Sequence, residues 1–154
     1  MTILSGGQTG VDRAALDVAL GAGVAVEGWC PAGRRAEDGV LDERYPLQET
    51  PTEAYAQRTE WNVRDSDATL IVAPIPPSGG TQWTAACAAE WQRPLWIASV
   101  HSPETVPLHV PRLVSWLATH GIQRLNVAGP RASEASTAYA ISAAVTQMLL
   151  QARR

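Results

Sequence analysis

The first thirty residues constrain the fold most, because they alternate between strand and helix patterns. The apolar run Met1–Ser5 leads into the glycine-rich segment Gly6–Gly10, and Val11–Leu20 then has apolar residues at helical spacing. Two glycines end this helix, and Val24–Trp29 is typical of a second strand. A strand, a helix and a strand in this order predict a right-handed crossover between two parallel strands.

The remainder of the chain continues the same alternation. Further strands are predicted at Ala68–Ala73, Pro94–Val100 and Arg124–Ala128, the first two as buried strands, with a short edge strand near Tyr45–Gln48. Further helices are predicted from Thr50 to Arg64, after the segment Pro74–Thr81 to about Trp91, over Pro111–His120, and from near Ser133 to the end. Capping boxes are predicted at Thr9–Asp12 and Thr50–Glu53. The pattern predicts one α/β domain, residues 1–154, with a mainly parallel sheet between two helical layers.

Composition excludes several classes of function. The chain has 154 residues and a formal net charge of −3, which argues against nucleic-acid binding. No apolar run is long enough for a membrane span and no signal segment is recognisable, so we expect a cytoplasmic protein. All 12 basic residues are arginine, which excludes a Walker phosphate loop, since that loop needs a lysine. The three histidines are scattered, and no metal site is expected.

Three junctions between a strand and the following helix are candidates for ligand binding: Ser5–Asp12, Ser78–Thr81 and Gly129–Ser133. Glycine allows a ligand to approach the backbone closely, and free N–H groups at a helix start attract anions. For the first two junctions to share a crevice, strand Ala68–Ala73 is expected beside strand Met1–Ser5. The alternative interpretation is that these glycines only close tight turns. The candidate ligand-binding or phosphate-binding residues are Gly6, Gly7, Gln8, Thr9, Gly10, Arg34, Arg35, Gly79, Gly80 and Thr81.

A second group of polar residues has weaker claims. Asp12, Arg13, Arg58, Asn62 and Arg131 are further candidates for ligand contact; Arg58 and Asn62 share one face of a helix. Glu37 and Asp38 are the candidates for acid–base catalysis. Trp29, Trp61 and Trp83 could stack on a flat heterocycle or could fill core and subunit contacts. Cys30 is either a reactive thiol at a strand end or a buried inert one.

The motifs together resemble a known family. Ser5-Gly6-Gly7-Gln8-Thr9-Gly10-Val11-Asp12-Arg13-Ala14-Ala15-Leu16-Asp17 is similar to the opening of the molybdenum cofactor carrier proteins. Further blocks that resemble this family are Gly28–Pro31, Gly33–Gly39, Arg58–Asp67, Ser78–Thr81 and Leu125–Arg131. The resemblance implies a Rossmann-like fold, related to the Lonely Guy phosphoribohydrolases, and a homo-oligomer that is a dimer or tetramer. It also implies that the chain carries molybdenum cofactor (molybdopterin), with molybdenum enzymes among the expected partners.

One departure distinguishes the chain from the related hydrolases. Their second glycine motif reads Gly-Gly-x-Gly-Thr-x-x-Glu, whereas here Thr81 follows Gly80 directly and Thr84 and Ala85 occupy the region of the glutamate. The sequence therefore favours binding of molybdenum cofactor or a similar small phosphorylated ligand. A nucleotide-processing hydrolase and a nucleotide-sensing protein remain the alternatives.

Overall fold

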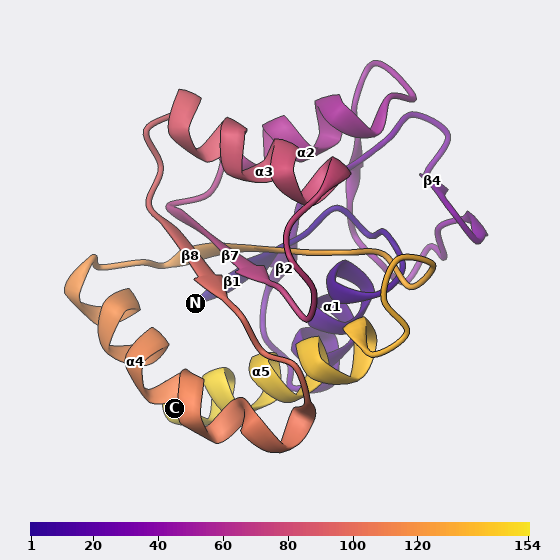
Figure 1. The fold of residues 1–154 in the computed structure, drawn as a ribbon. Helices are drawn as coiled ribbons and strands as arrows, with labels where there is room; N and C mark the ends of the chain where they lie inside the picture. The colour runs from indigo at the N-terminus through magenta and orange to yellow at the C-terminus, as the bar shows by residue number, and fades with distance from the viewer.

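A computed structural model describes residues 1–154 and has a five-stranded parallel sheet at its centre (Figure 1). The strand order is β2-β1-β9-β7-β8, and every neighbouring pair is parallel. The strands are β1 (Thr2–Leu4), β2 (Val26–Glu27), β7 (Ala68–Val72), β8 (Leu95–Ala98) and β9 (Arg124–Ala128). This confirms the predicted α/β class with a parallel sheet.

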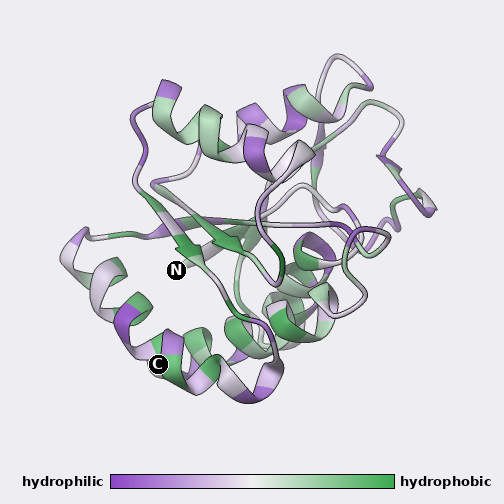
Figure 2. Cartoon of the chain, viewed as in Figure 1, coloured by the Kyte–Doolittle hydropathy of each residue, from purple (hydrophilic) through white to green (hydrophobic).

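Helices cover both faces of the sheet, which makes three layers. One layer consists of α2 (Tyr55–Arg64) and α3 (Gly79–Glu90), which pack on each other. The opposite layer consists of α1 (Val11–Gly21), α4 (Val106–Thr119), which follows the short η1 (Pro103–Thr105), and α5 (Ala138–Ala152). The strands are the most apolar part of the ribbon (Figure 2), and all five residues of β7 are buried. The main core lies between the sheet and the α1–α4–α5 layer.

The prediction that strand Ala68–Ala73 lies beside the first strand was wrong. β9, which is the last strand in the sequence, lies between β1 and β7 and pairs with both. Each strand was recognisable from its local pattern, but strand order depends on where the crossovers return the chain. Here α4 follows the edge strand β8 and brings the chain back to the middle of the sheet. The loop after β9 consequently separates the loops after β1 and β7.

Several element boundaries also differ from the predictions. Both predicted capping boxes are absent: α1 begins after Gly10 and α2 after Ala54, and neither has a side-chain cap. The Thr50 hydroxyl instead donates to the carbonyl of Thr52 at 2.9 Å, which stabilises a turn before the helix. The last helix begins at Ala138 rather than near Ser133.

The strand predicted at Pro94–Val100 is β8, and it is an edge strand rather than one buried on both faces. Ile97 is 45% exposed, because the sheet has no strand beyond β8. The predicted helix at Pro111–His120 begins one turn earlier, at Val106, and contains Pro111 in its interior.

Two small two-stranded sheets lie beside the main one. β3 (Trp29–Cys30) pairs with β6 (Gln48–Glu49) in parallel, and β4 (Arg35–Ala36) forms a hairpin with β5 (Gly39–Val40). This hairpin projects from the body of the molecule (Figure 1). No helix has both the length and the apolar character needed to cross a membrane.

Candidate functional site

A polar cleft opens at the carboxyl-terminal end of the sheet, where β1 and β9 end beneath α2 and α3. All three candidate junctions contribute to it. It is lined by Gly6, Gln8, Asp12, Arg58, Thr59, Asn62, Gly80, Thr81, Thr84, Asn126, Val127, Ala128, Gly129, Arg131 and Glu134. The cleft is partly open to solvent, and its cavity volume is about 40 Å³, which corresponds to roughly three water molecules. This space is large enough for a group such as a phosphate.

A buried ion pair lies at one side of the cleft. The Arg58 guanidinium lies 3.6 Å from the Asp12 carboxylate, and the two side chains are only 8% and 10% exposed. Arg58 Nη1 also donates to the carbonyl of Gly6 at 3.1 Å. Burial lowers the pKa of Arg58, which Asp12 opposes, and burial raises the pKa of Asp12, which Arg58 opposes. The loss of hydration on burial therefore offsets part of the free energy that the two charges gain by pairing.

Gln8 presents the least satisfied polar group of the cleft. Its Oε1 accepts hydrogen bonds from the backbone N–H groups of Thr9 at 3.0 Å and Glu37 at 2.9 Å, which fixes the orientation of the amide. The side chain is only 4% exposed, and its Nε2 is buried without an acceptor. A buried unpaired donor is costly, so this amide is suited to a ligand oxygen.

The amino terminus of α3 forms the opposite side. Its cap residue, Ser78, makes no side-chain cap hydrogen bond, and its first turn has no acidic residue. A side chain at Gly80 would meet no atom within 4 Å, so the backbone here is open to a ligand. Thr81 and Thr84 are buried against the cleft, and the Thr84 hydroxyl donates to the carbonyl of Gly80. A helix start of this kind attracts anions.

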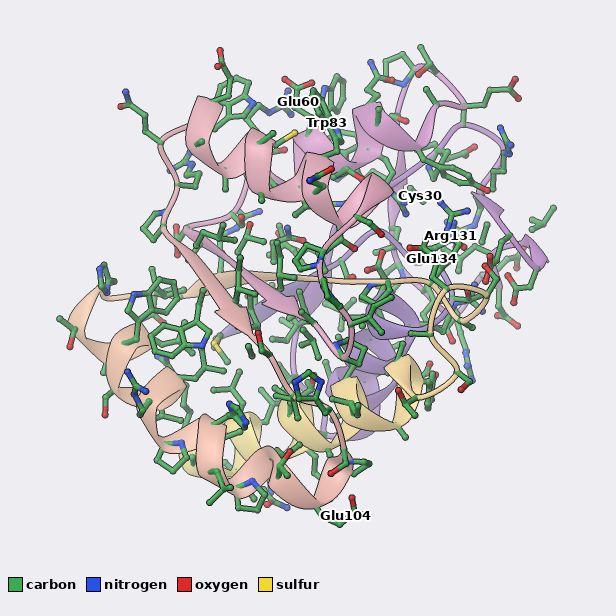
Figure 3. The ribbon with its side chains drawn as sticks, in the orientation of Figure 1. Cys30, Glu60, Trp83, Glu104, Arg131 and Glu134 are labelled. Atoms are coloured by element: carbon green, nitrogen blue, oxygen red, sulfur yellow. The ribbon has the colours of Figure 1, made fainter.

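Arg131 and Glu134, from the loop after β9, form the mouth of the cleft. They lie side by side in Figure 3, and Arg131 Nε donates to the Glu134 carboxylate at 3.0 Å. The Arg131 guanidinium also lies 5.2 Å from the centre of the Tyr55 ring, at the start of α2. The two carboxylates of the cleft, on Asp12 and Glu134, are therefore each paired with an arginine.

Three of the candidate glycines do not line the cleft. Gly7 has φ +77°, and a Cβ there would lie 2.8 Å from the side chain of Leu41, so its role is in packing. Gly10 has φ +81°, and a Cβ there would lie 2.6 Å from the carbonyl oxygen of Pro130. Gly79 lies just outside the lining of the cleft, next to Gly80.

Arg34 and Arg35 also lie outside the cleft. Arg34 donates to four backbone carbonyls, those of Leu41, Asp42, Tyr45 and Leu47. It therefore organises the loop around itself instead of presenting a free guanidinium. Arg35 is exposed on the hairpin, 4.9 Å from the centre of the Tyr55 ring.

The candidate acid–base residues connect loops away from the cleft. Glu37 accepts hydrogen bonds from the Thr9 hydroxyl and from the hydroxyl and N–H of Ser133. Asp38 forms two hydrogen bonds with Arg13, each 3.0 Å long, and these hold the pKa of Asp38 below its usual value. Neither carboxylate lines the cleft, and nor do Thr9 and Arg13.

The tryptophans and the cysteine lie elsewhere as well. Trp29 and Trp61 pack edge to face, 4.8 Å apart, and Trp83 lies in the α2–α3 layer away from Arg131 (Figure 3). Cys30 is fully buried, and burial raises the pKa of its thiol. Both properties are typical of an unreactive thiol. No cluster of three potential metal ligands occurs in the structure.

Some of the residues that line the cleft were not predicted from the sequence, namely Thr59, Thr84, Asn126 and Glu134. Asn126 had a recognisable signal, because it is a polar residue in the middle of the otherwise apolar segment Leu125–Ala128. Its side chain is 2% exposed and donates to the Thr69 hydroxyl at 3.2 Å. Asn62, which was a candidate, lines the cleft and also forms two hydrogen bonds with the backbone of Trp29.

Comparison with known proteins places the chain in a family. The model of the circularly permutated YpsA SLOG family matches residues 3–150. The chain belongs to this family. The solved structures include "Putative molybdenum carrier protein" from Syntrophus aciditrophicus SB, which is 40% identical with a TM-score of 0.89. The match covers 97% of this chain and 94% of that one. No protein of curated function matches the chain.

Membership of the SLOG family confirms the Rossmann-like fold and the resemblance to carrier proteins inferred from the sequence. Together with the structural relative, it supports a ligand-binding role. In this SLOG chain a buried arginine of α2, the unpaired amide of Gln8 and the amino terminus of α3 border one small cavity.

Proposed function

We propose that this protein binds and carries molybdenum cofactor or a similar phosphorylated heterocycle. The observation that carries the proposal is the set of donors around the small cavity. The buried Arg58 guanidinium, the unpaired Gln8 Nε2 and the amino terminus of α3 all border a space of phosphate size. Such donors suit a phosphate monoester, whose oxygens accept charge-assisted hydrogen bonds.

The structural relative supports the choice of cargo. It is called a molybdenum carrier protein, and it matches this chain over nearly its whole length. In the proposed complex the phosphate of the cofactor occupies the cavity beside Arg58 and Gln8, and the rest of the cofactor extends out through the mouth of the cleft. No protein metal ligand is needed, because the metal belongs to the cargo.

The cleft does not favour the hydrolase alternative. Its two carboxylates, on Asp12 and Glu134, are each paired with an arginine. Thr84 occupies the place where the related hydrolases have a glutamate, and its hydroxyl is bonded to the backbone of Gly80. No carboxylate in the cleft is free to act as a general base.

Anaerobic native mass spectrometry with molybdenum cofactor and AMP in competition tests the proposal. We expect a cofactor adduct that AMP does not displace, on a homo-oligomer whose subunits the same spectrum counts. Retention of AMP alone, or a hydrolysed nucleotide, would contradict the proposal.

A variant of Gln8 tests the cavity itself. Gln8→Glu keeps the oxygen that accepts from Thr9 and Glu37 but replaces the free N–H₂ donor with a carboxylate oxygen. Loss of a hydrogen bond to a charged group costs about 1.5–3 kcal/mol, so affinity is expected to fall about 10- to 100-fold. Gln151→Glu, on the exposed surface of α5, introduces the same charge away from the cleft and is the control. A thermal melt of each variant verifies folding, and equal affinity of the Gln8 variant and its control would contradict the placement of the phosphate.

A further inference from the structure

Three arginines surround the ring of Tyr55 at the mouth of the cleft. Their guanidinium carbons lie 4.9 Å (Arg35), 5.2 Å (Arg58) and 5.2 Å (Arg131) from the ring centre. They come from three separate segments: the projecting β4–β5 hairpin, α2 and the loop after β9. Tyr55 begins α2, so the fold gathers three positive charges at one end of this helix.

The cluster has more positive than negative charge. Arg58 is paired with Asp12 and Arg131 with Glu134, but Arg35 forms no ion pair with any carboxylate of the chain. Burial has the largest effect on the pKa of Arg58 and lowers it, and the positive charge of Arg131 lowers it further. Like charges held this close are stabilised by an anion between them.

The position of Arg131 connects this cluster to the cavity. Arg131 lines the cleft, whereas Arg35 borders a separate shallow hollow at the hairpin and Glu53, and the ring of Tyr55 lies between the two guanidinium groups and within about 5 Å of each. With a phosphate in the cleft beside Arg58 and Gln8, the remainder of the ligand would extend past Arg131 toward Tyr55. The ring face of Tyr55 is already engaged by guanidinium groups, which strengthens the attraction for negative charge there.

We propose that the mouth of the cleft holds a second anionic group of the ligand, bound by Arg35 and Arg131 beside Tyr55. Among phosphorylated heterocycles, those that carry two linked anionic groups, in the first place diphosphates, then bind more tightly than those that carry a single phosphate. The inference rests on the proposed function, since it assumes that the first phosphate occupies the cavity beside Arg58 and Gln8. Guanidinium forks bind phosphoryl oxygens in bidentate geometry, which suits this selection.

Isothermal titration with inorganic phosphate, pyrophosphate and tripolyphosphate at fixed pH and ionic strength tests the proposal. The informative quantity is the ratio of polyphosphate affinity to phosphate affinity, because any positive cleft binds the more charged ion more tightly. In the unmodified protein we expect a ratio of at least tenfold. In Arg131→Gln and in Arg35→Gln we expect that ratio to fall at least fivefold.

Arg64→Gln is the matched control. Arg64 also lies over an aromatic ring, 4.4 Å from that of Trp61, but at the opposite end of α2. The substitution removes one positive charge at the end of α2 away from Tyr55, and it is expected to leave the ratio within twofold. If phosphate binds but the ratio of polyphosphate affinity to phosphate affinity is equal in all three variants, the second subsite is refuted and the proposed function stands. Absence of binding by all three anions would contradict the proposed function itself.

Discussion

The buried pair of Asp12 and Arg58 allows a sharp prediction, because stability and anion binding should respond in opposite directions. In Asp12→Asn the amide keeps an oxygen that can accept from the Gln8 N–H, which the carboxylate now binds at 3.3 Å. The substitution removes the negative charge that faces a guanidinium only 8% exposed. Removing one partner of a buried pair costs about 3–5 kcal/mol. We expect the lower end, about 3 kcal/mol, since burial already raises the pKa of Asp12 and thus weakens the charged pair.

This loss is measurable by urea unfolding and by calorimetry at pH 7. For a chain of this length 1 kcal/mol corresponds to about 2–4 °C, so Tm should fall by roughly 6–12 °C. Glu27→Gln is the control, because Glu27 (49% exposed) and its partner Arg124 (44% exposed) form a surface pair. Such pairs contribute at most about 1 kcal/mol.

Phosphate should reverse much of the loss. With Asp12 neutral, an anion becomes the only counter-charge for Arg58, and we expect affinity to rise about tenfold, equivalent to 1.4 kcal/mol. Phosphate at 100 times its Kd stabilises the folded state by about 2.7 kcal/mol. A variant as stable as the unmodified protein, or one that binds phosphate more weakly, would refute the reasoning.

Three further predictions concern other parts of the fold. Gly7→Ala should lower the free energy of unfolding by roughly 2–5 kcal/mol, because of the left-handed backbone and the contact with Leu41. Gly33→Ala has φ +79° but open space around it, so it should lower the free energy of unfolding by only about 1–2 kcal/mol in the same urea titration. Desolvation raises the pKa of Glu37, but the hydrogen bonds that Glu37 accepts have a larger combined effect, and its pKa is lowered. Glu37 therefore stabilises the folded state above its ordinary pKa near 4.5, and this stabilisation is lost as the pH falls through the lowered pKa. Glu37→Gln should therefore flatten the acid limb of the stability profile, and an unchanged limb would contradict this role. Burial raises the pKa of Cys87 to about 11, so a disulfide reagent at pH 7.5 should label it only after unfolding; rapid labelling of the native protein would disprove the burial.

Much of the fold could be predicted from local pattern, because apolar runs and glycine turns carry their own physical meaning. Arg124–Ala128 was predicted with the bounds that β9 has, and β7 was predicted from an almost purely apolar run. The place of β9 between β1 and β7 could not be predicted in this way, since strand order depends on non-local packing. The error had little effect on the site, because all three junctions still meet at the same end of the sheet.

The candidate site was predictable in outline but not in its atoms. Arg58 and Asn62 were identified from their shared helix face, and both are buried beside the cleft. Arg34 was misplaced because a guanidinium that serves four backbone carbonyls is indistinguishable, in sequence, from one that awaits a phosphate. The unpaired Nε2 of Gln8 depends on hydrogen bonds from two other residues, and no pattern along the chain reveals it.

The central position of β9 has a consequence for the way in which the protein is made. During synthesis β1, β2, β7 and β8 leave the ribosome as two separate strand pairs, and the strand that joins them is the last of the five to emerge. The end of β9 and the loop behind it also supply one side of the cleft, including Asn126 and Arg131. A nascent chain therefore has no complete cleft until that strand is inserted, and no ligand can be bound there before β9 has joined the sheet.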